Sequence, residues 1–182
     1  MKKLLLLNIA AMLLIACQLK GSNTTTATEE TAATTEKTAE GTEVGCKFID
    51  IRLSGIYGVP ISVSEYVTKN KYTLVDFWAS WCGPCRAEMP TIVKAYADYH
   101  GRGFEVVGVS LDADHDAWVD AIDKLNMPWP QMSDLKGWNC AGARLYGVRS
   151  IPANLLIDQK GKIVATNLRG NDLLDKLAEL LK

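Results

Sequence analysis

The pattern of apolar and polar residues divides the chain into three parts. A short apolar run at residues 4–16 follows two lysines near the N-terminus. Residues 18–43 are nearly all Thr, Ala, Glu, Lys and Gly, with no Val, Ile or aromatic residue. From Val44 onward, apolar segments with strand and helix periodicity alternate to the end of the chain. This alternation predicts a single α/β domain over residues 44–182.

Segments rich in Val, Ile, Leu and aromatic residues predict the strands of this domain, namely 46–53, 58–63, 72–79, 104–111, 153–158 and 161–168. The first two flank a turn at 54–58, and the last two form a hairpin. Segments with helical spacing predict helices over 84–100, 115–126, 141–148 and 171–182. Pro84 suits a first helical position, whereas Pro90 predicts a kink inside the same helix.

The N-terminal apolar run, preceded by two lysines, is typical of a secretory signal peptide. It is too short to span a membrane comfortably, which disfavours the alternative of an anchor helix. Its end, "LIAC", resembles a bacterial lipoprotein signal, which implies cleavage after residue 16 and acylation of Cys17. The lipid would hold the protein on a membrane, on the extracytoplasmic (periplasmic) side where disulfides persist.

The polar segment between this signal and the domain predicts a flexible tether over residues 17–43, with Cys17 as its lipidated end. Its few apolar side chains cannot offset the entropy lost on ordering. A weak helix is the alternative, and the many threonines disfavour it.

Composition narrows the classes of function. The 182 residues are 48% hydrophobic with a net charge of −1, which suits a compact domain and offers no electrostatic basis for binding nucleic acid. The five cysteines are too few for a disulfide scaffold and leave at least one unpaired: Cys17, Cys46, Cys82, Cys85 and Cys140.

Cys82 and Cys85 form a Cys-Gly-Pro-Cys motif that indicates redox chemistry. A zinc site needs four ligands, often from a second cysteine pair, and so short a loop is a poor structural staple. Cys82 is expected just outside a helix N-terminus, where a thiolate is favoured, with Cys85 one turn inside. The outer sulfur would attack a substrate disulfide and the inner one would resolve it. Gly83 permits close approach of a partner backbone, and Trp81 supplies an apolar flank.

The segment "VDFWASWCGPC" resembles thioredoxin, and "YGVRSIPANLLID" resembles the thioredoxin segment that carries a cis-proline. Together with "VVGVSLD", these residues are most similar to the TlpA/ResA-type branch of thioredoxin-fold oxidoreductases, which is related to the AhpC/TSA family. The resemblance implies a central mixed β-sheet flanked by helices. It also implies an N-terminal β-hairpin and an inserted helix–strand unit at residues 112–134. No cofactor or metal is implied.

The resemblance also assigns roles to individual residues. Pro152 is expected to be cis and to face the cysteines, and the backbone of Ile151 is expected to pair with substrate. Gly83 and Pro84 are expected at the same substrate-binding surface. Asp76 matches the buried aspartate of thioredoxin, with a raised pKa that suits a proton acceptor for Cys85.

Glu88 matches a glutamate of the TlpA/ResA branch and shares a helix face with Cys85. Simpler interpretations stay open: a surface position for Asp76, an exposed helix position for Glu88 and core packing for Ile151.

The remaining aromatic, histidine and cysteine residues are expected to be structural. Trp118, Trp129 and Trp138 are predicted to pack the inserted unit, and Trp78 to be framework near the site. His100 and His115 are predicted at helix ends on the surface. Cys46 and Cys140 are interpreted as small buried hydrophobes, although a disulfide between them is possible.

The sequence therefore predicts a protein-disulfide reductase that acts on extracytoplasmic proteins with disulfides. Its Gly83-Pro84 dipeptide, which lacks a thiolate-stabilising histidine, favours reduction over oxidation. Such a reductase needs a membrane electron donor. One alternative is a peroxiredoxin-like thiol peroxidase, but that pattern requires proline and threonine where Val75 and Ala79 stand. Another is a non-catalytic lipoprotein that binds partners near Pro152.

Overall fold

The computed structural model describes residues 39–182. The strands are β1 (Arg52–Gly55), β2 (Pro60–Ser62), β3 (Tyr72–Trp78), β4 (Phe104–Ser110), β5 (Gln131–Ser133), β6 (Ala153–Asp158) and β7 (Ile163–Thr166). The helices are α1 (Val63–Val67), α2 (Gly83–Tyr99), α3 (His115–Lys124), α4 (Ala141–Leu145) and α5 (Asn171–Leu180), with 3₁₀ turns η1 (His100–Arg102) and η2 (Gly137–Asn139). The predicted signal peptide and Cys17 lie outside the described residues. Within residues 39–182, no helix is long and apolar enough to cross a membrane.

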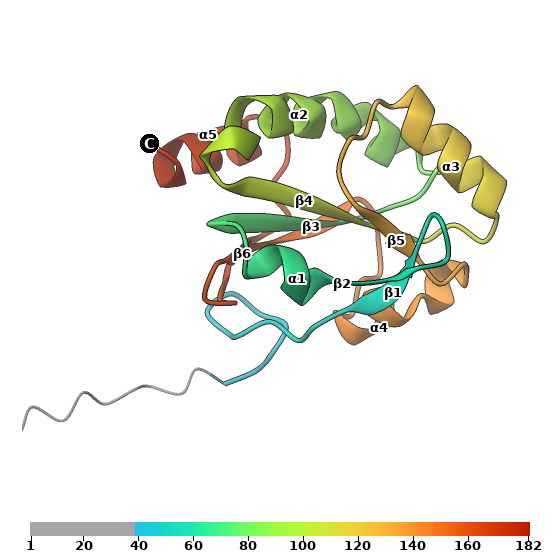
Figure 1. Cartoon of the computed structure of the whole chain (residues 1–182), viewed down its shortest axis with the longest axis horizontal. Coiled ribbons are helices and arrows are strands. Elements are labelled where there is room, and N and C mark those ends of the chain that lie inside the picture. The colour runs from blue at the N-terminus through green and yellow to red at the C-terminus, as the bar shows by residue number, and fades with distance from the viewer. Residues whose placement is uncertain (1–38) are drawn as a thin grey trace, which may run out of the picture. The chain divides into compact units, whose positions relative to one another are not determined.

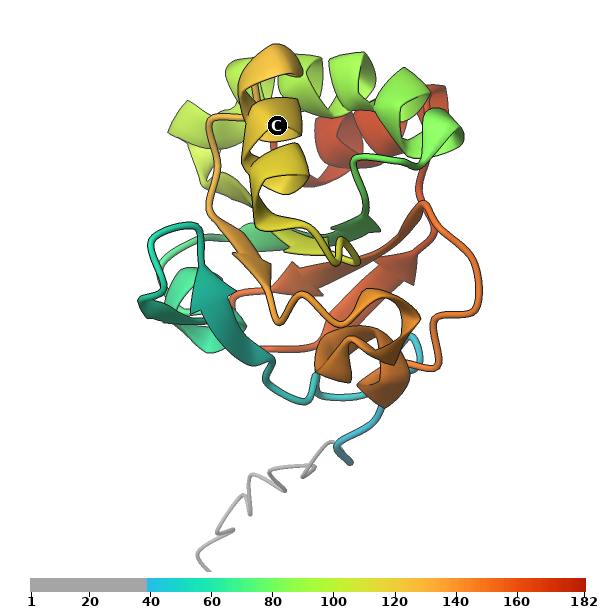
Figure 2. The ribbon, with the colours of Figure 1, turned by 90° about the vertical axis from the view of Figure 1, so that its right-hand side faces the viewer.

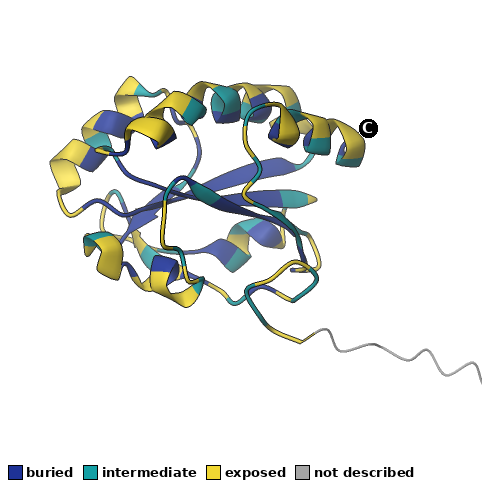
Figure 3. Cartoon of the chain, turned by 180° about the vertical axis from the view of Figure 1, so that it is seen from behind, coloured by how far each residue is buried: buried dark blue, intermediate teal, exposed yellow. Residues whose placement is uncertain are grey.

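The strands form one mixed sheet in the order β2-β1-β5-β4-β3-β6-β7 (Figure 1). β4 is the middle strand, and β3 lies next to it, parallel to β4 and antiparallel to β6. Helices α2, α3 and α5 cover one face of the sheet, and α1 and α4 cover the other (Figures 1 and 2). Since both faces are covered, every residue of β4 is buried, including the polar Glu105 and Ser110. Figure 3 shows exposed residues along the outer faces of the helices and buried ones in the central strands.

The inserted helix–strand unit is present as predicted, in the form of α3 and β5. Asp114 caps α3, because its carboxylate accepts a hydrogen bond of 3.0 Å from the Ala117 amide. β5 pairs in parallel with β4 and antiparallel with β1. It therefore joins the N-terminal hairpin of β1 and β2 to the rest of the sheet.

The prediction of a strand over residues 46–53 is largely wrong, because β1 begins only at Arg52 and extends to Gly55, into the predicted turn. The residues before β1 run instead along the opposite edge of the sheet. The Phe48 amide donates to the Gly161 carbonyl (2.8 Å), and the Ile163 amide donates to the Cys46 carbonyl (2.9 Å). A second difference is α1, which begins at Val63 where the sequence predicted the end of a strand.

The domain includes the last residues of the predicted tether. The Lys47 amide donates to the Ala39 carbonyl (3.0 Å), and the Gly41 amide donates to the Lys47 carbonyl (2.9 Å). Ala39 and Gly41 are therefore anchored to the folded domain, although the sequence assigned them to the tether over residues 17–43.

Most of the residues expected to be structural are where the sequence placed them. Trp118 and Trp129 are buried beside the inserted unit, and Trp78 is buried with its indole N–H donating to Gln131. Trp138 is 48% exposed, so its prediction as a packing residue is wrong.

The two remaining cysteines of the described domain are both free thiols. Cys140 is buried and Cys46 is partly exposed. The structure therefore has no disulfide between them.

Candidate active site

Cys82 and Cys85 lie at the N-terminus of α2 and form a disulfide with an S–S distance of 2.04 Å. Cys82 is the N-cap residue, and its Sγ accepts a hydrogen bond of 3.2 Å from the Cys85 amide. The helix begins at Gly83, one residue before the predicted start. The outer sulfur therefore occupies the position where helix amides and the helix dipole stabilise a thiolate.

The two sulfurs differ in access to solvent. Cys82 is 5% exposed, whereas Cys85 is completely buried. Gly83 and Pro84 between them are exposed, and a Cβ added at Gly83 would meet no atom within 4 Å. The surface at Gly83, next to Cys82, is thus open to the backbone of another protein, whereas Cys85 has no exposed surface.

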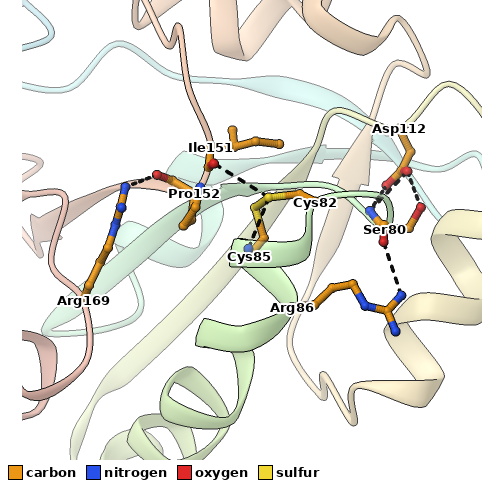
Figure 4. The surroundings of a disulfide bond; sticks show 8 residues. All are labelled: Ser80, Cys82, Cys85, Arg86, Asp112, Ile151, Pro152 and Arg169. Carbon is orange, nitrogen blue, oxygen red and sulfur yellow. Dashed lines mark hydrogen bonds between the residues drawn. A yellow bond between two sulfur atoms is a disulfide. The ribbon is translucent and has the colours of Figure 1, made fainter.

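The loop before β6 faces the disulfide (Figure 4). The Ile151–Pro152 peptide bond is cis, as predicted. The Ile151 carbonyl oxygen lies 3.7 Å from Cys82 Sγ. Residues about seventy positions apart in the sequence therefore meet at one sulfur atom, as the sequence comparison with thioredoxin implied.

Asp76 is buried in the middle of β3, with 1% exposure. Neither of its carboxyl oxygens has a hydrogen-bond partner among the described residues. Burial raises the pKa of Asp76 to about 7; the nearby Glu88 carboxylate adds to the rise and the Arg169 guanidinium opposes it. The surface interpretation of Asp76 is thereby excluded, and the carboxyl can exchange a proton near neutral pH.

Glu88 is half-buried on α2, one turn after Cys85. Its Oε1 accepts a hydrogen bond of 2.6 Å from the amide of Gly170, the N-cap residue of α5. Glu88 therefore links the helix that carries the cysteines to the start of α5. The interpretation as a freely exposed helix glutamate does not fit this contact.

The loop between β7 and α5 brings a further charge to the site, which the sequence did not predict. The Arg169 guanidinium donates to the Pro152 carbonyl (Figure 4). Asn154 fixes the same loop, since its side chain accepts from the Leu168 amide (2.9 Å) and donates to the Leu168 carbonyl (2.8 Å). Both Arg169 and Asn154 thus hold the loop against the strand that begins just after Pro152.

A buried carboxylate also supports the turn that leads into the motif. Asp112 Oδ1 accepts from the Ser80 hydroxyl (2.6 Å), and Asp112 Oδ2 accepts from the Ser80 amide (3.0 Å) and the Ser110 hydroxyl (2.7 Å). The Ser80 carbonyl in turn accepts from Arg86 on α2 (3.3 Å; Figure 4). A signal for this network exists in the sequence, because Ser80 and Asp112 both follow parallel strands, whose carboxyl ends meet at one edge.

No group of three or more His, Cys, Asp or Glu side chains that could hold a metal ion occurs within residues 39–182.

Comparison with known proteins places this site in a family. The model of the AhpC/TSA family matches residues 44–166. The chain belongs to this family. ResA, a thiol-disulfide oxidoreductase of Bacillus thuringiensis (strain Al Hakam), is 30% identical over 143 residues, or 79% of each chain.

Solved structures agree with this placement. The thioredoxin domain of a thiol-disulfide oxidoreductase from Bacteroides vulgatus has a TM-score of 0.70 and 32% identity, covering 77% of this chain and 99% of that one. A thiol-disulfide oxidoreductase from Bacteroides fragilis has a TM-score of 0.68 and 34% identity, covering 73% and 98%. The predictions of a thioredoxin-like fold and of a thiol-disulfide oxidoreductase are confirmed. The roles of single residues stay predictions.

Proposed function

We propose that this protein reduces disulfides of extracytoplasmic proteins while it is tethered to a membrane through Cys17. One observation carries the proposal: a cysteine pair at a helix N-terminus, whose outer member, Cys82, is slightly exposed and faces the cis-proline loop. The Gly83-Pro84 dipeptide supports the reducing direction, because it offers no histidine to stabilise the Cys82 thiolate and so make the disulfide more oxidising.

The reaction begins with both cysteines reduced. The Cys82 thiolate attacks one sulfur of the substrate disulfide, which forms a mixed disulfide and releases the other substrate sulfur as a thiolate. The Cys85 thiolate then attacks Cys82 Sγ, which forms the Cys82–Cys85 disulfide and releases the second substrate thiolate. Two electrons pass from the dithiol to the substrate, whose two thiolates take up protons.

Asp76 accepts the proton that Cys85 must lose before it attacks. A group with a pKa of about 7 is ionised often enough near neutral pH to accept that proton and can release it again. Glu88 lies one turn after Cys85, and its negative charge raises the pKa of Asp76. Both facts support a role for Glu88, together with Asp76, in this proton transfer. Its contact with Gly170 supports a positioning role as well.

Substrate binding uses the surface around Cys82. An extended substrate segment would pair with the Ile151 backbone before Pro152, and its cysteine would pass over the exposed Gly83-Pro84 turn beside Trp81. The cis-proline loop, held by Arg169, supplies one wall of this surface.

The N-terminal segment supports the cellular setting. The "LIAC" sequence favours lipidation of Cys17, and the polar residues that follow would let the domain reach partners near the membrane. Because each substrate reduced leaves the protein oxidised, a membrane electron donor with a dithiol must restore it.

The redox potential tests the direction of electron flow. Equilibrating the full chain against glutathione buffers should give a potential below about −220 mV, nearer to thioredoxin than to strong oxidants such as DsbA. A value above about −180 mV, in the isomerase range, would reverse the proposed direction. Rapid peroxide turnover without protein disulfides would instead support the thiol peroxidase alternative.

A further inference from the structure

Two tryptophans lie exposed beside the reactive sulfur. Trp81 directly precedes Cys82 and is 55% exposed, and Trp138 of η2 is 48% exposed. Their ring centroids are 6.1 Å apart at an interplanar angle of 54°. Leu135, in the connection before η2, is 37% exposed. We refer to Trp81 and Trp138 as the aromatic shelf.

The connection that carries Trp138 and Leu135 has a defined conformation. The Leu135 amide donates to the Ser133 hydroxyl (3.0 Å). The Asp134 carboxylate accepts from the Ala141 amide (2.9 Å) and the Lys136 amide (3.3 Å). Leu135 itself has a φ of 55°, which a bulky side chain rarely adopts. The chain thus presents these apolar side chains to solvent on a hydrogen-bonded support instead of folding them into the core.

Resting on the proposed function, we infer that the aromatic shelf binds a large apolar side chain next to the reactive cysteine of a protein substrate, and that Trp138 sets this preference. A substrate sulfur has to reach Cys82, one side of which is occupied by the Ile151 carbonyl at 3.7 Å. Trp81 is covalently adjacent to Cys82, so substrate residues that flank the reacting cysteine come within reach of the shelf.

The two indole rings of the aromatic shelf favour an apolar or aromatic side chain of the substrate. Burying a half-exposed indole ring against an apolar or aromatic side chain gives a favourable binding free energy. Tryptophan is also enriched among the interface residues that contribute most of the binding energy. Trp138 is outside the Cys-Gly-Pro-Cys motif, so it can change preference without changing the sulfur chemistry. It acts as a specificity-determining residue, and its partner is Trp81, which directly precedes the motif.

Single-turnover kinetics with pre-reduced full chain test this inference. Two disulfide peptides are compared that differ only in Phe or Ser beside the cysteine, together with hydroxyethyl disulfide, which has no side chain to dock. Trp138→Ala should raise the half-saturating concentration of the Phe peptide by roughly tenfold, with little change in limiting rate. Its reaction with the Ser peptide and hydroxyethyl disulfide should be unchanged. Trp138→Phe should retain most of the preference.

Tyr57→Ala is the matched control, because Tyr57 is an exposed ring on the β1–β2 turn outside the shelf. This variant should behave as wild type on all three substrates. Equal effects of Trp138→Ala on all three, or no effect on the Phe peptide, would overturn the inference while leaving the reductase proposal intact. A wild-type protein that reduces none of the three would refute the proposed function itself.

Discussion

Arg169 donates a hydrogen bond to the carbonyl oxygen of Pro152, and its positive charge also lowers the pKa of the buried Asp76. One side chain from the loop before α5 therefore acts on both the substrate-facing loop and the carboxyl proposed to accept a proton. Burial and the Glu88 carboxylate both raise the pKa of Asp76, and the Arg169 guanidinium opposes them.

Replacing Arg169 should shift the pH dependence of disulfide reduction. Without the guanidinium, the Asp76 pKa rises, so less Asp76 is ionised at neutral pH and less can accept the Cys85 proton. Arg169→Gln should move the acid limb of the pH–rate profile to higher pH and slow the reaction several-fold at pH 7. Arg149→Gln is the control, because Arg149 is exposed in the neighbouring loop. An unshifted profile in Arg169→Gln would contradict this role.

The two cysteines should have separable functions. Cys82→Ser should abolish reduction of insulin disulfides, because only Cys82 is accessible for the first attack. Cys85→Ser should accumulate mixed disulfides, because the resolving thiol is gone. Alkylation of the native reduced protein at neutral pH checks the same assignment. Faster labelling of Cys85 than of Cys82 would show the roles to be reversed.

The acids near the thiols should affect the second step. Asp76→Asn or Glu88→Gln should slow resolution of the mixed disulfide, by about tenfold or more for Asp76, and shift its pH profile without unfolding the domain. Rapid quenching of a reaction with a disulfide peptide measures the lifetime of the mixed disulfide. Glu65→Gln, an exposed position on α1, is the control. Wild-type lifetimes across the pH range in both acid variants would rule out proton transfer by either residue.

Asp76 should also make stability depend on pH. Its folded-state pKa of about 7 lies above the ordinary 3.8, so ionisation opposes folding. The contribution of Asp76 to wild-type stability should therefore fall as pH rises from about 4 to about 7 and then level off. Asp76→Asn cannot ionise, so its stability relative to wild type should increase across this window, by on the order of a few kcal/mol.

Urea unfolding of the oxidised proteins at several pH values measures this difference. The control is Asp123→Asn, since Asp123 is exposed on α3, and its difference from wild type should stay flat. A flat difference for Asp76→Asn as well would mean that Asp76 is not a buried acid with a raised pKa.

Local sequence patterns were sufficient to predict the elements around the dithiol. β3 and β4 were predicted to within one residue, because their apolar runs suit strands that are buried on both faces. Pro84 located the start of α2 to within one residue. The Ile-Pro pair was linked to the cysteines only through resemblance, since no local rule joins positions so far apart.

The features missed depend on contacts between distant residues. Residues 46–51 have an apolar pattern that suits a strand. However, the Phe48 amide donates a hydrogen bond to the Gly161 carbonyl, at the opposite edge of the sheet from β1 and β2. Arg169 shows no local sign of its contact with Pro152. Trp138 was predicted to pack the inserted unit, but it is 48% exposed and its ring lies against that of Trp81, far from it in the sequence.

The short strand β5 has a consequence for how the protein is made. β1 joins the sheet through the pairing of Ser54 and Gly55 with Ser133 and Met132. During synthesis the hairpin residues emerge first, and their partner strand emerges only after most of the domain's sequence has followed. Until then the hairpin has unpaired strand edges, which other chains or proteases can capture. β1 and β2 are therefore synthesised long before β5, the strand that pairs them with the rest of the sheet.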